Sequence, residues 1–266
     1  MLKDKYELKD LLEIMALLRS EKGCPWDREQ THESLKRYLI EETYEVLEAI
    51  DLNSSKKMCE ELGDLLLQVV FQAQIASEKN AFNMQDVITA ICRKLILRHT
   101  HVFGNDKADT PEEVVNNWEA IKKKEKGIKS HTEVLKDVPS NLPALMRSFK
   151  VQQKASQVGF DLDNAEDVFD KVLEEIQELK DVYKSKNVAR ITDEMGDVFF
   201  SLVNLSRFLD VQPELALSET TNKFIKRFEY IEKEALKSGK NLEEMTLSEM
   251  DKLWNEAKIH ISGKKG

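Results

Sequence analysis

The chain has 266 residues, of which 41% are hydrophobic and 33% are charged, and its formal net charge is −9. This composition is typical of a globular protein with a heavily charged surface and excludes a disordered chain. The acidic balance argues against a nucleic acid polymer as partner, because such binding usually requires a basic face. The length favours two domains of about 130 residues each.

Apolar residues recur at helical spacing along most of the chain, and strand-like alternation is scarce, so we expect an all-α protein. In chain order, the helices of the first half are expected at 4–20, 31–51, 57–79, 84–98 and 111–126. Thr31 and Thr110 are the expected N-caps, the latter with Pro111 at the first helical position. The helices of the second half are expected at 141–156, 165–184, 188–209, 212–237 and 246–260.

The sequence contains an internal repeat with an offset of 133 residues. Residues 40–76 align with residues 173–209, and in both copies sixteen positions separate an ExxE motif from an ExxD motif. Between the copies, residues 127–143 contain one glycine, two prolines and weak periodicity, which is typical of a linker. We therefore expect two related helical domains, 1–134 and 135–266.

Three further features bear on the compartment. The cysteines Cys24, Cys59 and Cys92 form no CxxC pair, so we expect reduced thiols in a cytoplasmic protein. The first ten residues are charged and lack the apolar core of a signal peptide. No apolar run approaches the length of about 18 residues that a membrane span requires, so no membrane partner is expected.

The repeated motifs place acidic residues in pairs, because residues three apart share one face of a helix. The helix that continues from each ExxD motif is otherwise apolar. Burying a carboxylate near the start of such a helix costs free energy unless the charge has a partner. Divalent cations would relieve the repulsion between clustered carboxylates, and ligands with oxygen alone indicate Mg²⁺ or Mn²⁺. The pattern predicts a metal site in at least one half, with one or several ions, although acidic helix faces are often merely solvated.

Basic residues accompany both acidic motifs. Lys223 and Arg227 are four apart on the helix beyond the acids, and Lys94 and Arg98 match them in the first half. Such cations suit phosphate groups, although two solvated surface cations are the alternative. Lys171, one turn before the second ExxE motif, adds a third phosphate contact.

Single residues give weaker indications. Trp118 and Trp254 could stack on a nucleobase, although tryptophans late in a helix more often lie in a core or an interface. Asn204 continues the polar stripe of an apolar helix and could contact either a base edge or a neighbouring side chain. His99 and His101 lack a third ligand nearby, so a loop or core position is favoured over a metal site.

Taken in order, these motifs resemble the MazG family of nucleoside triphosphate pyrophosphohydrolases. The first copy has EETYEVLEAI and EELGDLLLQVVF after GCPWDREQTHESL, and the second has KVLEEIQELK, DEMGDVFFSLVNLSRFL and KFIKRF. The resemblance covers roughly 8–258. It implies two tandem all-α domains whose helical bundles are completed by dimerisation. It also implies Mg²⁺-dependent hydrolysis of NTP to NMP and pyrophosphate, with broad base tolerance and a role in clearing nucleotides.

The resemblance implies site residues as well, and it favours the second domain as the catalytic one. The implied metal ligands are Glu175, Glu178, Glu194 and Asp197. The implied residues of the nucleotide site are Lys171, Glu174, Arg190, Asp197, Lys223, Arg227 and Trp254. The resemblance also implies catalytic roles for Glu174, Glu175 and Lys223. Glu174 would be either the general base or an acid that supports the metal ligands without binding the metal itself. The family often has an asparagine at the position of Thr221, which leaves that polar contact open.

The first half retains the pattern only in part. It would provide a second metal site with the ligands Glu42, Glu45, Glu61 and Asp64, and with phosphate contacts from Lys94 and Arg98. Tyr38 replaces Lys171 and Phe71 replaces Asn204, so this half is either a weaker second site or a structural copy. Two alternatives to a pyrophosphohydrolase of broad base tolerance remain. One is a helical module that binds a nucleotide or a partner protein without turnover, and the other is a pyrophosphohydrolase narrow for one nucleotide such as dUTP.

Overall fold

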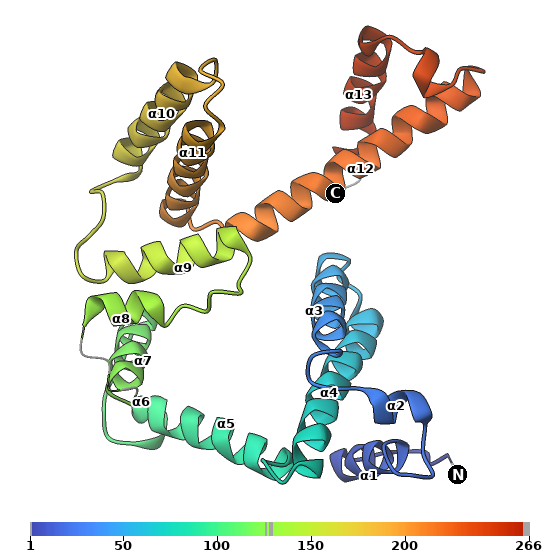
Figure 1. The fold of residues 1–266 in the computed structure, drawn as a ribbon, viewed down its shortest axis with the longest axis vertical. Coiled ribbons are helices and arrows are strands. Elements are labelled where there is room, and N and C mark those ends of the chain that lie inside the picture. The colour runs from blue at the N-terminus through green and yellow to red at the C-terminus, as the bar shows by residue number, and fades with distance from the viewer. Residues whose placement is uncertain (1, 126, 128–129, 263–266) are drawn as a thin grey trace. The chain divides into compact units, whose positions relative to one another are not determined.

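The computed structural model describes residues 2–125, 127 and 130–262, except for the side chains of 261–262. Over these residues the chain consists of helices and loops without a strand, which confirms the expected all-α class (Figure 1). Contacts divide the chain into two compact units, Met1–Lys122 (unit 1) and Lys123–Gly266 (unit 2). In the part that is described, no helix is both long enough and apolar enough to cross a membrane.

Unit 1 is organised around the pair α3 and α4, which lie side by side, with α1 packed on α4 and α5 at its end (Figure 1). The elements that begin in this unit are α1 (Leu8–Leu18), α2 (Pro25–Glu29), α3 (Lys36–Asp51), α4 (Ser55–Glu78), α5 (Met84–Arg98), α6 (Thr100–Phe103) and α7 (Pro111–Glu125).

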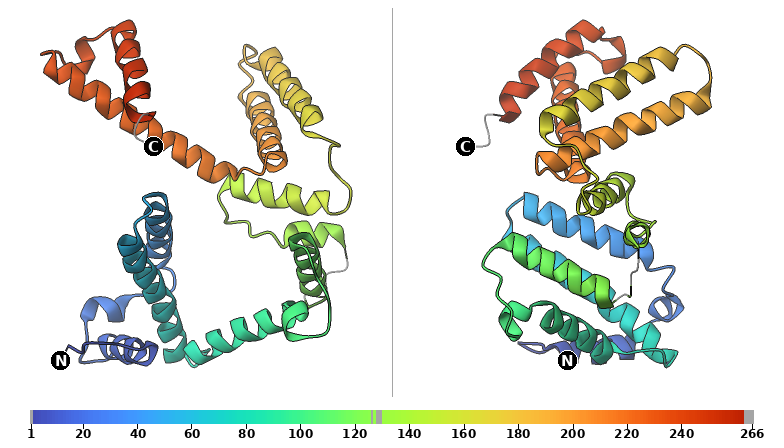
Figure 2. Two further views of the ribbon diagram at one scale, coloured as in Figure 1. Left: turned by 180° about the vertical axis from the view of Figure 1, so that it is seen from behind. Right: turned by 90° about the vertical axis from the view of Figure 1, so that its left-hand side faces the viewer.

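Unit 2 repeats the same pair as α10 and α11, with α9 packed on α11 (Figure 2). The principal partners of α12 are α13 and then α9. The elements are α8 (His131–Lys136), α9 (Ala144–Ser156), α10 (Ala165–Val182), α11 (Val188–Phe208), α12 (Pro213–Lys237), the 3₁₀ helix η1 (Leu242–Glu244) and α13 (Leu247–Ser262).

The turn inside each helix pair is built in the same way. Asn53 and Lys186, which are 133 residues apart, both have a positive φ, 49° and 58°. The next residue, Ser54 or Asn187, caps the following helix by accepting a hydrogen bond of 3.3 Å from the amide three residues on. A left-handed residue followed by an N-cap reverses the chain within a few residues. The two pairs therefore bring their ExxE and ExxD motifs together in the same register.

The interiors of the two units are filled differently. In unit 1 the largest cluster of buried residues is Met15, Leu35, Val70, Phe71 and Ile75, with Tyr38 packed against it. In unit 2 the corresponding cluster is smaller and consists of Val168, Val172 and Leu205. Unit 1 thus places two aromatic side chains beside its helix pair at positions where the repeat in unit 2 has polar ones.

Several local predictions can be compared with these elements. Thr110 is confirmed as an N-cap, because its hydroxyl accepts a hydrogen bond from the Glu113 amide at 3.2 Å. Thr31 is not one, since α3 begins only at Lys36 and the Thr31 hydroxyl instead accepts from Ser34 in the preceding turn. The expected linker carries α8, and the sequence-based boundary between residues 134 and 135 falls within that helix. Helices as short as α2, α6 and α8 contain too few turns to show a hydrophobic period.

Candidate active site

Three carboxylates of unit 2 converge where α10 and α11 lie side by side. Glu175 comes from α10, while Glu194 and Asp197 come from successive turns of α11. One oxygen of each lies within 4.8 Å of the others, and Glu175 is only 7% exposed. Carboxylate oxygens without histidine or cysteine are the donors that a hard cation such as Mg²⁺ prefers. We refer to these three residues as the unit 2 acid cluster.

Unit 1 has a matching group, the unit 1 acid cluster, formed by Glu42 and Glu45 of α3 and Glu61 of α4. Its oxygens also lie within 4.8 Å of one another. Each cluster therefore contains three of the four acids in the expected sets, and the remaining ones are Asp64 and Glu178. The two triplets differ, because unit 1 uses both residues of its ExxE motif and unit 2 uses both residues of its ExxD motif.

A lysine neutralises the buried end of the unit 2 acid cluster. The Nζ of Lys171 lies 2.8 Å from Glu175 Oε1 and donates to Glu174 Oε1 at 2.9 Å. These two hydrogen bonds raise the pKa of Lys171 well above its ordinary value, so the ammonium stays charged. Arg190 makes a looser, exposed ion pair, with its Nε 3.8 Å from Glu194 Oε1.

Glu178 interacts electrostatically with this cluster, although it is not one of its three residues. Burial raises the pKa of its carboxyl, and the neighbouring charges of Glu175 and Glu194 raise it further. Repulsion of this kind is relieved when a cation enters the group. Glu178 is thus a fourth acid whose charge interacts with the cluster, although it is not one of the three converging carboxylates.

The unit 1 acid cluster lacks the lysine. Tyr38 occupies the position of Lys171, and the nearby Lys57 forms its ion pair with Glu48. Burial raises the pKa of Glu61, and the contact with Glu45 adds to the effect. The negative charges of these carboxylates are therefore neutralised less than those of unit 2, and a bound cation would relieve their mutual repulsion as well.

A cavity of about 530 Å³ opens beside the unit 2 acid cluster, a size typical of sites for small molecules. At one end it is lined by Lys171, Glu175 and Asp197. Its other polar lining residues are Gln152, Asp161, Ser201, Asn204 and Arg207, and its apolar walls include Val151, Leu162, Phe160 and Phe200. The cavity thus joins a candidate metal cluster to an apolar chamber with a few polar groups.

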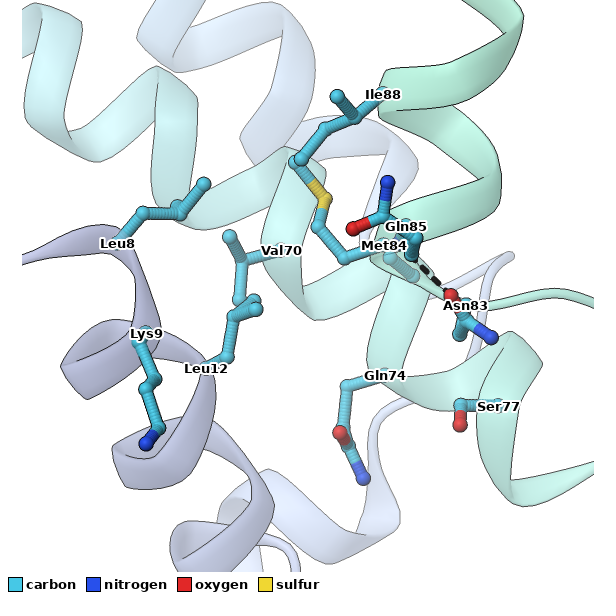
Figure 3. A pocket seen from close by; sticks show the side chains of 11 residues that line it. Leu8, Lys9, Leu12, Val70, Gln74, Ser77, Asn83, Met84, Gln85 and Ile88 are labelled. Carbon is cyan, nitrogen blue, oxygen red and sulfur yellow. Dashed lines mark hydrogen bonds between the residues drawn. The ribbon is translucent and has the colours of Figure 1, made fainter.

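The equivalent space in unit 1 is occupied by the protein itself. Phe71, which replaces Asn204, is 3% exposed and belongs to the hydrophobic core, where Tyr38 packs against the same cluster. A pocket of about 380 Å³ does exist in this unit, between α1, α4 and α5 (Figure 3). Residues such as Leu12, Val70 and Met84 line it, and none of the unit 1 acid cluster does.

The basic and aromatic residues expected at the nucleotide site form a second group in unit 2. The guanidinium of Arg227 stacks 5.3 Å from the ring centre of Trp254, and Phe224 lies 5.1 Å from the same ring. Lys223 is exposed on the same helix, α12. Since α12 packs mainly on α13 and α9, this group is assembled separately from the α10–α11 pair.

The same stacking recurs in the first repeat. The guanidinium carbon of Arg98 lies 5.2 Å from the ring centre of Trp118. Lys94, one turn earlier on α5, is exposed. The sequence indicated these arginines and tryptophans separately, but their pairing depends on how α5 packs near α7 and how α12 packs on α13.

Two residues that line the unit 2 cavity were not singled out from the sequence. Gln152 of α9 donates from Nε2 to the carbonyl of Phe200 at 2.8 Å, across 48 positions of the chain. Arg207 forms an ion pair with Asp161 and donates to Asn204. Gln152 lies outside the aligned segments 40–76 and 173–209, and the first copy has Gln74 at the position of Arg207, so the repeat could not indicate either residue.

Comparison with known proteins assigns the chain to a family. Residues 30–103 and 155–231 each match the MazG nucleotide pyrophosphohydrolase domain. The chain belongs to the MazG family. The two matches contain the two acid clusters, and the resemblance predicted from the sequence is confirmed.

Relatives of this MazG chain match it over nearly its whole length. A Thermotoga maritima protein named nucleoside triphosphate pyrophosphohydrolase/pyrophosphatase MazG is 49% identical over 250 residues, which cover 94% of this chain and 95% of the relative. An Escherichia coli K12 protein named nucleoside triphosphate pyrophosphohydrolase is 42% identical over 257 residues, with coverage of 95% and 97%. The uncharacterized Bacillus subtilis protein YabN is 46% identical over 254 residues, which cover 95% of this chain and 52% of YabN.

Proposed function

We propose that the chain hydrolyses nucleoside triphosphates to the monophosphate and pyrophosphate, and that unit 2 performs the reaction. The observation that carries this proposal is the cavity of about 530 Å³ that adjoins the unit 2 acid cluster. Membership of a nucleotide pyrophosphohydrolase family and the names of two full-length relatives support the substrate class.

The donors of the unit 2 acid cluster fit Mg²⁺, with Mn²⁺ as a substitute. Glu175, Glu194 and Asp197 would hold the cation, with Glu178 at the edge of the group. When bound, it would lower the pKa of a water molecule and neutralise phosphate oxygens. Glu174, which is exposed and hydrogen-bonded to Lys171, is the candidate base that accepts the proton of the attacking water.

The cationic side chains would stabilise negative charge on the phosphates. Lys171 lines the cavity and stays protonated, so its Nζ can move from the carboxylates to a phosphate oxygen. Arg190 borders the cluster through Glu194. Lys223 and Arg227 would supply further charge from α12, and their group would have to approach the α10–α11 pair for that purpose.

Broad base tolerance and a role in clearing cytoplasmic nucleotides are further parts of the proposal. The apolar cavity walls, including Phe160 and Phe200, suit any aromatic base, because every base has a π-face. Unit 1 would then be a copy that retains the acids without a nucleotide chamber, since Phe71 and Tyr38 fill the equivalent space.

A homodimer is the assembly that the exposed surface of α11 favours. Gly196 lies in the middle of this helix, where glycine costs about 1 kcal/mol relative to alanine. A Cβ added there would meet no atom of the described chain within 4 Å, and the same holds for Gly63, its counterpart in α4. Met195 and Phe199, 39% and 54% exposed, flank Gly196 in a shallow apolar groove. A helix of a second copy lying across this groove would account for both the glycine and the exposed side chains.

The dimer proposal leads to a mutational prediction. Phe199→Glu is expected to raise the dissociation constant of the dimer by about 100-fold, because a charge would be buried in an apolar contact. Sedimentation velocity at matched concentrations measures this shift, with Lys180→Glu, an exposed change on α10, as the control. If both variants and the parent chain sediment alike, Phe199 lies outside the interface.

The reaction itself is tested by product analysis. We expect NMP and pyrophosphate from a panel of ribo- and deoxynucleoside triphosphates in Mg²⁺, and no products in excess EDTA. Formation of NDP and phosphate would contradict the proposal. Tight Mg²⁺-dependent binding without turnover would favour a module that sequesters nucleotides, and turnover of dUTP alone would replace broad tolerance by a narrow specificity.

A further inference from the structure

We infer that the chamber of the unit 2 cavity is a nucleobase pocket in which Asn204 donates to the edge of the base. The inference rests on the proposed function, which places the triphosphate at the unit 2 acid cluster. Four observations on the residues that line the cavity carry it: the orientation of Asn204, an unpartnered acceptor on Gln152, the length of the chamber, and the contrast with unit 1.

The orientation of the Asn204 amide is fixed by Arg207. Its Oδ1 accepts from Arg207 Nε at 3.3 Å and from Nη2 at 2.9 Å. Arg207 is itself held by an ion pair with Asp161 and stacks 4.7 Å from the ring centre of Phe208. With its oxygen engaged by a guanidinium, the amide must present Nδ2 on the other side. That nitrogen has no hydrogen-bond partner among the residues that the structure describes.

Gln152 supplies an acceptor in the same cavity. Its side chain is buried, with the residue 8% exposed, and Nε2 donates to the Phe200 carbonyl at 2.8 Å. Its Oε1 is buried without a partner in the described structure. An unsatisfied buried acceptor is unfavourable, so a ligand that donates to it would be stabilised. The Watson–Crick edge of every base carries at least one donor and one acceptor, which complements a free amide donor and a free amide acceptor.

The chamber has the proportions of a nucleoside attached to a triphosphate. Asp197 and Asn204 are seven residues apart on α11, which places them about 10 Å apart along the helix axis. Phosphates at the acid cluster would therefore leave the base near Asn204. Phe160, which is 82% exposed, and Phe200 offer aromatic surface on which the base can stack.

Unit 1 lacks the Asn204 amide and the arginine that orients it. Phe71 replaces Asn204, and Gln74 replaces Arg207, so neither the donor nor the guanidinium that orients it is present. The Phe71 ring is buried in the core cluster of that unit. Since both units keep an acid cluster, the difference between them lies in the chamber that would receive the base.

The test uses Asn204→Asp in the full-length chain. Aspartate keeps an oxygen for Arg207 but cannot donate when ionised, so the orienting contact survives and the donor is lost. The affinity for the α,β-methylene analogues of ATP, GTP, CTP and UTP, measured by calorimetry with Mg²⁺, is expected to fall about tenfold or more. The affinity for tripolyphosphate, which has no base, is expected to stay the same. Asn116→Asp, an exposed change of equal charge in α7, is the matched control.

The outcomes separate this inference from the proposed function. Equal affinities of parent and Asn204→Asp chains for the four analogues would overturn the pocket, and so would an equal loss for tripolyphosphate, which would indicate charge repulsion alone. Absence of hydrolysis by the parent chain would instead overturn the proposed function. Asn204→Phe, which introduces the residue of unit 1, is expected to abolish analogue binding while tripolyphosphate still binds. Unchanged analogue binding by that variant would also contradict the pocket.

Discussion

Glu175→Gln is expected to lower turnover of nucleoside triphosphates by about 10³-fold, whereas Glu42→Gln is expected to leave it within about twofold of the parent chain. The two glutamates occupy equivalent positions of the repeat, 133 residues apart. Glu175 lines the cavity beside its cluster, while the corresponding space next to Glu42 is filled by Phe71 and Tyr38. Both substitutions preserve side-chain shape and remove one charge, so the comparison isolates the role of each cluster.

The measurement is the initial rate of pyrophosphate release at saturating Mg²⁺, with the unfolding midpoint of each variant as a control for folding. Removal of Glu42, whose pKa is raised by burial and by Asp64, relieves repulsion and is not expected to destabilise the chain. A loss in Glu42→Gln as large as that in Glu175→Gln would mean that turnover requires both acid clusters. A loss in Glu42→Gln alone would reverse the assignment.

Lys171→Met is expected to reduce kcat/KM by about 10²- to 10³-fold, since it removes a cation that lines the cavity and would face the phosphates of a bound nucleotide. The raised pKa of Lys171 keeps the ammonium charged at any pH near neutrality, so the loss is expected to be independent of pH in that range. In the absence of metal, the variant is also expected to melt earlier, because the buried Glu175 loses its counter-charge.

Melting curves with and without Mg²⁺ distinguish this role from a purely structural one. Mg²⁺ is expected to restore the melting temperature of Lys171→Met, because the cation replaces the missing positive charge, but not its turnover. Lys180→Met, an exposed change later on the same helix, is the matched control. If Mg²⁺ restored turnover as well, Lys171 would serve only to compensate the carboxylates of the metal-free chain.

The sequence predicted the helices and the acidic motifs well, because both depend on local periodicity. Residues three apart share a helix face wherever the helix forms, and a repeated turn at Asn53 and Lys186 sets the register between the two helices. The spacing could not decide which three acids would meet. Asp64 in one unit and Glu178 in the other lie outside the triplets, because small differences in packing decide which carboxylates converge.

The cavity could not be predicted from motif spacing. It depends on Gln152, which reaches α11 from a helix that lies about 50 positions earlier, and on the ion pair that joins Arg207 to Asp161. The replacement of Asn204 by Phe71 in the first repeat was visible in the sequence. Its consequence, an aromatic ring in the hydrophobic core where unit 2 has a chamber, required the packing of both units.

Hydrolysis of nucleoside triphosphates in ¹⁸O-labelled water tests the central claim most directly. The phosphates at the unit 2 acid cluster would be attacked by water at the α-phosphorus, so mass spectrometry is expected to find one labelled oxygen in the NMP and none in the pyrophosphate. The same experiment with Glu175→Gln is expected to yield almost no labelled product, while Glu42→Gln yields labelled NMP like the parent chain. Label in the pyrophosphate, or undiminished labelling of NMP by Glu175→Gln, would contradict the assignment of the reaction to this cluster.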